Sequence, residues 1–388
     1  MNKIVSVLGC TGSIGKQSLN VIASHPEQMT LFGIAANRQV EALVRMANEF
    51  HPRVVACETK FDTKRLPADT EAIIGEGAVE RLAAMSEPDV VVNGISGFSA
   101  LAPLIASLQA GKRVALANKE SIVCGKSLVD ETIRQYKGEI LPVDSEQSAF
   151  FQCLQNGRKE EVEELILTAS GGPFWTKQRS ELEQITVEQA LAHPTWNMGK
   201  KITIDSATLF NKGLEVIEAA YLFDMPPEKI RVVIHPQSIV HSMVAYRDGT
   251  CMANMSKPDM RLPIQYAITY PERIVSSCAP LRLYLEQPLA FYQPDFKRFL
   301  SLGLAYDALK AGKSLPLAYN GANEAAVEAF CNGKIGFLDI ERVVDYTLNQ
   351  HTIESLNTLE DIVEANRCVR VLANRTIERV AQERRNTQ

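Results

Sequence analysis

The segment from His193 to Glu218 (HPTWNMGKKITIDSATLFNKGLEVIE) carries an unusual mixture of groups that can take part in chemistry. It contains a His, a Trp, several Ser and Thr hydroxyls, and an Asn-Lys pair at 211 and 212. Hydroxyls, an amide and an ammonium group that converge at a helix N-terminus are suited to bind a phosphate. Asn211 and Glu215 are four residues apart and share a face of a predicted helix. The segment therefore predicts a phosphate site, with a capped and solvated helix as the alternative.

Two carboxylates stand close together in Asp144-Ser145-Glu146, directly after a predicted strand over 140–143. Residues i and i+2 of an extended chain project to the same side, so both carboxylates can meet one cation. Oxygen ligands of this kind suit Mg²⁺ or Mn²⁺ rather than zinc. Such a triplet alone is more typical of a solvated turn. A third carboxylate from Glu215 would favour a metal site.

A glycine-rich sequence, Gly9-Cys10-Thr11-Gly12-Ser13-Ile14-Gly15, follows the first predicted strand and opens the first predicted helix. Glycines at this place permit a tight turn and the close approach of a pyrophosphate to the helix N-terminus. The order of strand, turn and helix predicts a dinucleotide site. A structural turn without a nucleotide is the alternative.

The residues after the second predicted strand, Asn37-Arg38-Gln39, include no carboxylate and one guanidinium group. An NAD site would use an acidic residue here for the ribose 2′-hydroxyl, whereas a 2′-phosphate would pair with Arg38. The sequence therefore predicts NADP as the cofactor. The alternative is that Arg38 is an ordinary surface charge.

Asn118-Lys119-Glu120 follows a later strand of the same predicted sheet, and ligands of open parallel sheets lie beyond such strand ends. Asn118 and Glu120 are expected to face the cofactor and Lys119 the substrate. A plain helix start explains these three residues equally well.

The segment 171–200 is rich in Gly and Pro and is predicted to be a long loop with a short helix inside it. It contains both tryptophans of the chain, Trp175 and Trp196, which could cover a substrate pocket or pack as structural residues. Ser170-Gly171-Gly172 lies at its start and is either a phosphate loop or a plain turn. His193 could donate to a phosphate, and His241 is either an active-site or a core histidine.

Short apolar runs alternate with amphipathic segments up to about residue 135, which predicts βαβ units on a parallel sheet. The central part is less regular, 271–298 has four prolines and no clear period, and the remainder is helical. Thr358 and Asp361 have the spacing of a capping box. The expected strands are 4–8, 31–35, 54–57, 90–93, 113–116, 140–143, 162–167, 202–204, 232–234, 242–246 and 251–255.

The overall composition bounds the class of protein. A formal net charge of −5 argues against a nucleic-acid or anionic membrane surface, and no apolar run approaches the ~18 residues of a membrane span. The first strand begins at once, which leaves no room for a targeting peptide, and none of the eight cysteines forms a CxxC pair. A cytoplasmic protein of two or three domains is expected.

Seven motifs in this order resemble the 1-deoxy-D-xylulose 5-phosphate reductoisomerase family almost from end to end. They are GCTGSIG at 9–15, ANKES at 117–121, PVDSEQSA at 142–149, TASGGPF at 168–174, HPTWNMG at 193–199, DSATLFNKGLE at 205–215 and HPQSIVHSMV at 235–244. Cys10 and Gln39 depart from the family pattern, in which Ser or Thr and Asn are more usual. Both departures concern cofactor affinity and leave the reaction class unchanged.

The resemblance implies a role for each group of site residues. NADPH would be bound by Thr11, Gly12, Ser13, Ile14, Asn37, Arg38, Gln39, Asn118 and Glu120. One divalent cation, Mg²⁺ or Mn²⁺, would be held by Asp144, Glu146 and Glu215. The phosphorylated sugar would contact Lys119 and Ser145, with its phosphate end on Ser170, His193, Ser206, Asn211 and Lys212 and the Trp196 loop closing as a lid. Lys119, His193 and the three carboxylates would form the catalytic set.

The fold implied is α/β. It comprises a Rossmann-like NADPH domain over 1–135, a catalytic α/β domain over 136–270 with the lid loop 171–200, a linker over 271–298 and a helical bundle over 299–388. The family also implies a homodimer that acts on a small phosphorylated sugar, without nucleic acid or membrane.

The implied reaction is a skeletal rearrangement of 1-deoxy-D-xylulose 5-phosphate, by retro-aldol cleavage and re-addition, followed by hydride reduction to 2-C-methyl-D-erythritol 4-phosphate. This is a step of non-mevalonate isoprenoid synthesis. An NADP-dependent sugar-phosphate or semialdehyde dehydrogenase without rearrangement is one alternative, and a non-enzymatic NADP-binding protein is another. Neither alternative needs three carboxylates together.

Overall fold

The computed structural model describes residues 2–196 and 198–387, and this part of the chain forms two compact units. The first unit comprises residues 1–121, 127–148 and 259–280, and the second comprises 122–126, 149–258 and 281–388. The predicted boundaries at 135, 270 and 298 do not coincide with these units. The C-terminal helices share the second unit with most of the central segment, and the three-domain division stays a prediction.

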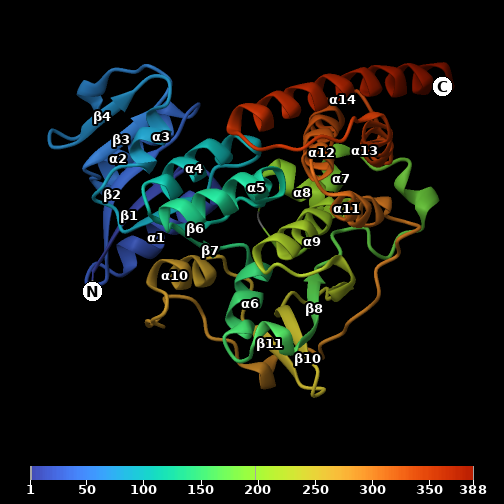
Figure 1. The fold of residues 1–388 in the computed structure, drawn as a ribbon, viewed down its shortest axis with the longest axis horizontal. Coiled ribbons are helices and arrows are strands. Elements are labelled where there is room, and N and C mark those ends of the chain that lie inside the picture. Colours follow the sequence, from blue (N-terminus) through green and yellow to red (C-terminus); the bar gives the residue numbers. More distant parts are fainter. Residues whose placement is uncertain (1, 197, 388) are drawn as a thin grey trace. The chain divides into compact units, whose positions relative to one another are not determined.

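The first unit is built on a seven-stranded parallel sheet in the order β4-β3-β2-β1-β5-β6-β7 (Figure 1, blue to teal). Its central strands read as continuous apolar runs because a parallel sheet is covered on both faces. The strands are β1 (Lys3–Leu8), β2 (Met29–Ala35), β3 (Val54–Cys57), β4 (Glu71–Ile74), β5 (Val90–Asn93), β6 (Arg113–Leu116) and β7 (Glu139–Pro142). The helices include α1 (Ser13–Ser24), α2 (Val40–Phe50), α3 (Ala78–Ala83), α4 (Leu101–Gln109) and α10 (Arg261–Thr269), and α5 (Lys119–Tyr136) begins in this unit.

The order of strands reverses between β1 and β5. From β1 the chain proceeds outward to β2, β3 and β4, and from β5 it proceeds outward on the other side to β6 and β7. The loops that leave the carboxyl ends of these two central strands therefore diverge, which makes the crevice between them the ordinary ligand position of an open α/β sheet. The glycine-rich loop 9–12 begins at this point.

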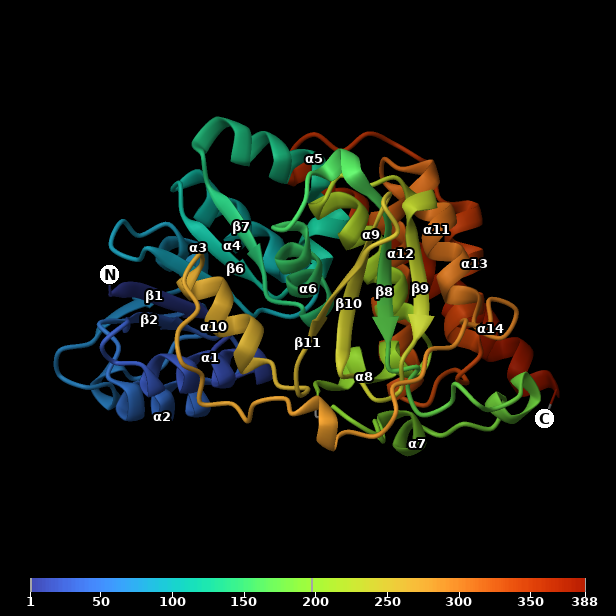
Figure 2. The ribbon, with the colours of Figure 1, turned by 90° about the horizontal axis from the view of Figure 1, so that it is seen from below.

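The second unit contains a four-stranded mixed sheet in the order β11-β10-β8-β9, whose strands run side by side in Figure 2. These strands are β8 (Val162–Ala169), β9 (Ile230–Ile234), β10 (Val240–Tyr246) and β11 (Cys251–Met255). Helices α7 (Val187–Leu191), α8 (Lys200–Ala207), α9 (Phe210–Leu222), α11 (Leu300–Ala311), α12 (Leu315–Cys331), α13 (Asp339–Gln350) and α14 (Leu359–Thr387) belong to it, together with most of α6 (Ser145–Leu154). One apolar core joins sheet and helices, with Phe150, Phe210 and Tyr319 among its fully buried side chains.

Most of the predicted elements are confirmed, and the predicted α/β fold class with them. The strand predicted at 202–204 is wrong, because these residues lie inside α8, and the strand β4 was not predicted. The long segment 171–200 does contain short helices, and Thr358 caps α14: its hydroxyl accepts from the Asp361 N–H at 3.1 Å while its own N–H donates to Asp361. No helix in residues 2–196 and 198–387 is long and apolar enough to cross a membrane.

Candidate active site

The glycine-rich loop makes the close backbone contacts that a pyrophosphate-binding turn requires. Gly9 has a φ of +74°, and a Cβ at this residue would lie 2.8 Å from the carbonyl oxygen of Gly94. A Cβ on Gly15 would lie 2.3 Å from the carbonyl oxygen of Gly9. Thr11, Gly12 and Ser13 are half-buried or exposed, and no side chain caps the N-terminus of α1. The turn thus leaves the helix N–H groups available to an anion.

The residues that follow β2 are exposed, as a cofactor-binding segment needs to be. Asn37, Arg38 and Gln39 all lie at the surface after the buried strand. The sequence prediction missed Glu58, whose carboxylate accepts a hydrogen bond of 2.5 Å from the Asn37 amide. Glu58 directly follows β3, so its position after a neighbouring strand end was the signal that could have identified it. The guanidinium of Arg38 is the cation of this segment.

Asn118, Lys119 and Glu120 lie at the start of α5 and are all nearly buried. The Asn118 side chain caps the helix by accepting from the Ser121 N–H at 2.8 Å, and its amide donates to Glu120 at 2.9 Å. The helix-start interpretation is therefore correct for the backbone. Lys119 forms an ion pair of 2.6 Å with Asp144, and 5% of its side chain is exposed.

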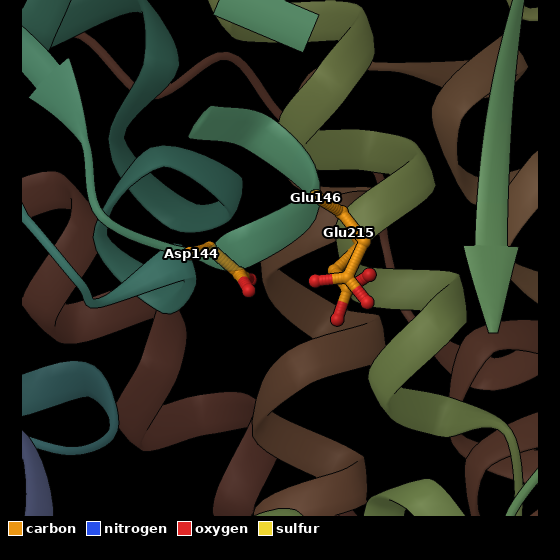
Figure 3. A group of neighbouring side chains, drawn as sticks. All are labelled: Asp144, Glu146 and Glu215. Atoms are coloured by element: carbon orange, nitrogen blue, oxygen red, sulfur yellow. The ribbon is translucent and has the colours of Figure 1, made fainter. Parts of the chain in front are cut away.

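Three carboxylates meet in Figure 3. One ligand oxygen from each of Asp144, Glu146 and Glu215 lies within 4.8 Å of the others. Asp144 precedes α6, Glu146 lies in the first turn of this helix, and Glu215 lies on α9. The expectation that Asp144 and Glu146 project together from a strand was wrong, because the strand ends at Pro142 and Glu146 is helical. The three carboxylates still meet, although Asp144 and Glu146 approach one another through a helix start and not along a strand. Their role as metal ligands stays a prediction.

Buried lysines accompany two of these carboxylates. Lys212 pairs with Glu215 on α9, and the two side chains are 5% and 1% exposed. Asn211 also donates to Glu215, at 2.5 Å. Ser145 donates to Glu146 at 2.5 Å. The positive charges of Lys119 and Lys212 stabilise ionised carboxylates at low exposure, where an unpaired charge would be costly.

Ser170, His193 and Ser206 form one cluster. The His193 Nε2 lies 3.1 Å from the Oγ of Ser170 and 3.1 Å from the Oγ of Ser206. Its Nδ1 accepts from the backbone N–H groups of Thr195 and Trp196, so the proton of the neutral ring is on Nε2 and points at the two hydroxyls. Burial lowers the pKa of His193 below its ordinary value. The cluster offers one ring N–H and two hydroxyls to an anion.

The loop after β8 contacts α8 closely. Gly172 has a φ of +66°, and a Cβ on it would lie 2.7 Å from the backbone oxygen of Ser206. Ser206 is in the last turn of α8 and Thr208 is its C-cap, so neither residue follows a strand as the predicted strand at 202–204 would require. Leu209, between α8 and α9, has a φ of +60°. A side chain in this left-handed region costs about 1–3 kcal/mol, so surrounding contacts must hold it.

The two tryptophan side chains of the 171–200 segment have different surroundings. Trp175 packs on Tyr292 with ring centroids 5.0 Å apart, which makes it a structural residue. Trp196 lies 6.4 Å from His241, whose Nε2 is 2.8 Å from the Ser256 hydroxyl. The backbone N–H of Trp196 also donates to the Nδ1 of His193 at 2.9 Å, so Trp196 is the tryptophan next to the His193 cluster.

These features define the class of protein. It is an α/β protein with a dinucleotide-type crevice in one parallel sheet and with three neighbouring carboxylates that suit a hard divalent cation. Comparison with known proteins then gives the family. Models for the 1-deoxy-D-xylulose 5-phosphate reductoisomerase match residues 5–126, and those for its C-terminal regions match 140–223 and 255–372. The chain belongs to the 1-deoxy-D-xylulose 5-phosphate reductoisomerase family.

Relatives of the same description agree over nearly the whole chain. That of Chlorobium phaeobacteroides is 49% identical over 97% of this chain and 99% of the relative, and that of Chlorobaculum tepidum is 47% identical over 97% and 100%. The reductoisomerase of Zymomonas mobilis in complex with NADPH superposes with a TM-score of 0.91 at 38% identity, covering 97% of this chain and 100% of the other. A DOX-P reductoisomerase in complex with NADPH, fosmidomycin and magnesium gives the same TM-score and identity, over 97% and 98%. The predicted family and its class of enzyme, an NADP-dependent oxidoreductase, are confirmed.

Proposed function

We propose that this chain converts 1-deoxy-D-xylulose 5-phosphate to 2-C-methyl-D-erythritol 4-phosphate with NADPH and one divalent cation. The observation that carries the proposal is the meeting of Asp144, Glu146 and Glu215 within 4.8 Å, in a chain of the reductoisomerase family. Three carboxylates are the oxygen ligands that Mg²⁺ and Mn²⁺ prefer. When bound, the cation supplies Lewis acidity to the substrate oxygens and the nicotinamide supplies the hydride.

We assign the protein groups by what they can bind and orient. Asp144, Glu146 and Glu215 are the metal ligands, and Lys119 and Ser145 contact the substrate beside them. The ion pairs of Lys119 with Asp144 and of Lys212 with Glu215 offset part of the negative charge of the three carboxylates. Binding and orientation are the main contributions that the protein makes to such a reaction.

The phosphate end of the substrate is assigned to the His193 cluster. Ser170 and Ser206 offer hydroxyls on either side of His193, and Asn211 and Lys212 follow on α9. A phosphate bound far from the reacting carbons can use its binding energy to order the substrate and close the loop that carries Trp196. We therefore assign the segment 171–200 as the lid.

The cofactor is assigned to the crevice of the first unit. The N-terminus of α1, with Thr11, Gly12, Ser13 and Ile14, would receive the pyrophosphate. The 2′-phosphate would be bound by the exposed segment after β2, Asn37, Arg38 and Gln39. Asn118 and Glu120 would complete the nicotinamide side. The departures at Cys10 and Gln39 lie in this region.

The raised pKa values of three thiols disfavour the alternative of a dehydrogenase with a cysteine nucleophile. Burial raises the pKa of Cys10 to about 12 and that of Cys153 to about 11. Burial also raises the pKa of Cys251. Because the thiolate is the nucleophile, these groups are poorly suited to attack an aldehyde at neutral pH.

We also propose a cytoplasmic homodimer that uses either Mg²⁺ or Mn²⁺, with the functional division at 1–135, 136–270, 271–298 and 299–388. Support for self-association comes from β11, an edge strand that exposes Met252 and Met255. An exposed apolar edge strand is a ready site for pairing with another chain.

The direct test is NADPH oxidation with deoxyxylulose phosphate in the presence of Mg²⁺, then after EDTA, then after Mg²⁺ or Mn²⁺ is restored. We expect activity to disappear with EDTA and to return with either cation, because the three carboxylates hold the cation that polarises the substrate. Unchanged activity in EDTA would overturn the metal assignment. NADPH oxidation without formation of methylerythritol phosphate would favour a plain dehydrogenase.

A further inference from the structure

The junction between α8 and α9 is held from behind by a buried hydrogen bond to α12. The amide of Asn323 donates to the Asp205 carboxylate at 2.8 Å, and the residues are 0% and 1% exposed. Lys201, one turn earlier on α8, forms an ion pair of 2.7 Å with the other carboxylate oxygen. Asp205 belongs to the motif DSATLFNKGLE, but neither the metal site nor the phosphate cluster uses it.

A second buried contact reaches the same junction from α11. The hydroxyl of Ser301 donates to the backbone oxygen of Thr208 at 2.6 Å, and Tyr319 of α12 donates to the Ser301 carbonyl at 3.1 Å. Ser301 and Tyr319 are 0% exposed. The C-terminal end of α8 is therefore held through the side chain of Asp205 and through the carbonyl group of its C-cap, Thr208.

Fixing this turn has a direct consequence for Ser206. Successive residues of a helix point about 100° apart, so Asp205 can face α12 while Ser206 faces His193. The next connection contains Leu209, whose left-handed φ of +60° sets the direction in which α9 departs with Asn211 and Lys212. A rotation of α8 would move Ser206 away from His193 and change the relation between the two helices.

We propose that Asp205, Asn323 and Ser301 are positioning residues for the phosphate cluster. They hold α8 and the α8–α9 turn so that Ser206, Asn211 and Lys212 face the same anion as Ser170 and His193. This inference rests on the proposed function, because it concerns the phosphate end of the same substrate. It assigns to the C-terminal helices a role in substrate recognition, through contacts within the second unit.

The test compares two buried asparagines of α12. Asn323→Ala removes the contact to Asp205, whereas Asn320→Ala removes an equally buried amide whose partners are Glu324 and Cys124. Both substitutions delete the same atoms from the same helix, so a general loss of stability affects both. Ser301→Ala is the milder second variant, should Asn323→Ala fail to fold.

Two kinetic readouts separate positioning from stability. For Asn323→Ala we expect the KM for deoxyxylulose phosphate to rise about tenfold with kcat within about twofold, the pattern of lost binding. The kcat/KM for unphosphorylated 1-deoxy-D-xylulose should change by less than about twofold, since it presents no phosphate to the cluster. Asn320→Ala should leave both values as in the wild type. Equal losses with both substrates, or equal effects of the two asparagine variants, would overturn the inference.

Binding of inorganic phosphate to the protein without turnover keeps the inference independent of the proposed reaction. Phosphate titrations followed by ³¹P line broadening should show weaker binding in Asn323→Ala and Ser301→Ala than in the wild type and in Asn320→Ala. If the wild type fails to turn over deoxyxylulose phosphate but this order of phosphate affinity holds, the proposed function fails and the positioning inference stands. If turnover is observed and phosphate binds equally to all four proteins, the positioning inference is overturned alone.

Discussion

At the scale of residues, the chemistry depends on a few charges whose environments differ. Arg38 is exposed after β2, where a phosphate can reach it, whereas Lys119 is buried and paired with Asp144. The first residue can be changed with little effect on folding, since exposed positions tolerate substitution. The second takes part in a pair whose disruption leaves a buried charge. The two positions therefore call for different tests.

Replacing Arg38 tests the choice of cofactor. Arg38→Ala should lower the affinity for NADPH roughly 10–100-fold, because it removes charge-assisted hydrogen bonds to the 2′-phosphate. It should change the affinity for NADH by less than about twofold. Fluorescence titration with both cofactors measures the difference. Arg53→Ala, an exposed arginine that precedes β3 at the opposite end of the sheet, is the matched control. Equal losses for NADPH and NADH would contradict the 2′-phosphate assignment.

Replacing Asp144 tests the metal assignment. Asp144→Asn removes one of three charges from the carboxylate group and should lower kcat by on the order of 10³-fold, as expected when a Lewis acid is lost. NADPH should still bind, which a fluorescence titration without substrate can show. Asp69→Asn, an exposed carboxylate before β4, should leave turnover unchanged. A large fall in NADPH affinity would place Asp144 at the cofactor instead.

At the scale of elements, buried polar side chains hold separate segments of the second unit together. His235, 0% exposed, accepts the N–H groups of Ile239 and Val240 at Nε2 and donates from Nδ1 to the carbonyl of Ala290. Its ring stacks on Phe291 at 4.6 Å. It thereby ties the turn before β10 to the extended segment that returns from 281–298. The imidazole must be neutral for all three bonds to form.

The state of His235 gives a pH prediction. Burial lowers its pKa from the ordinary value of 6.5, so protonation is disfavoured in the folded state. The stability that depends on the neutral ring is complete above about pH 6.5 and decreases as the pH falls toward the folded pKa. Urea unfolding between pH 7 and pH 5 should show a shallower loss of stability for His235→Gln than for the wild type. A slope equal to that of the wild type would refute this role, and His51→Gln, at an exposed site, should retain the wild-type slope.

At the scale of the whole molecule, the functional groups come from segments far apart in the sequence. The glycine-rich loop precedes residue 16, the carboxylates lie at 144, 146 and 215, and Asn323 of α12 supports α8 from more than a hundred residues away. The C-terminal helices α11 and α12 share one apolar core with α8 and α9, and Ser301 and Asn323 form hydrogen bonds to Thr208 and Asp205. The number of chains in the assembled protein is a further property at this scale.

The molar mass of the protein in solution tests the proposed homodimer. A chain of 42.9 kDa should show about twice this mass by light scattering at micromolar concentration, because the exposed apolar edge of β11 favours pairing. A mass near that of one chain over the whole concentration range would contradict the homodimer.

The sequence alone predicted the parallel sheet, the glycine-rich turn and the residue types that we assign to the metal and phosphate sites. These follow from local rules: apolar runs between turn residues predict buried strands, Gly9 has a left-handed φ of +74°, and Gly15 contacts the Gly9 carbonyl within the same turn. The same local rules failed at 202–204, where a short β-branched run is compatible with strand or helix and packing against α12 decides for helix. They also failed at Asp144 and Glu146, which meet through a helix start.

Only the tertiary structure showed that Glu215 lies within 4.8 Å of the other two carboxylates. It also revealed that Ser170 and Ser206 share His193, and that Glu58 lies beside Asn37. Such contacts between side chains of different elements depend on how the elements pack and on buried hydrogen bonds such as that of Asn323 with Asp205. The spacing of residues along the chain does not predict these contacts, because the distance between two side chains on different elements is fixed by the core that packs between those elements.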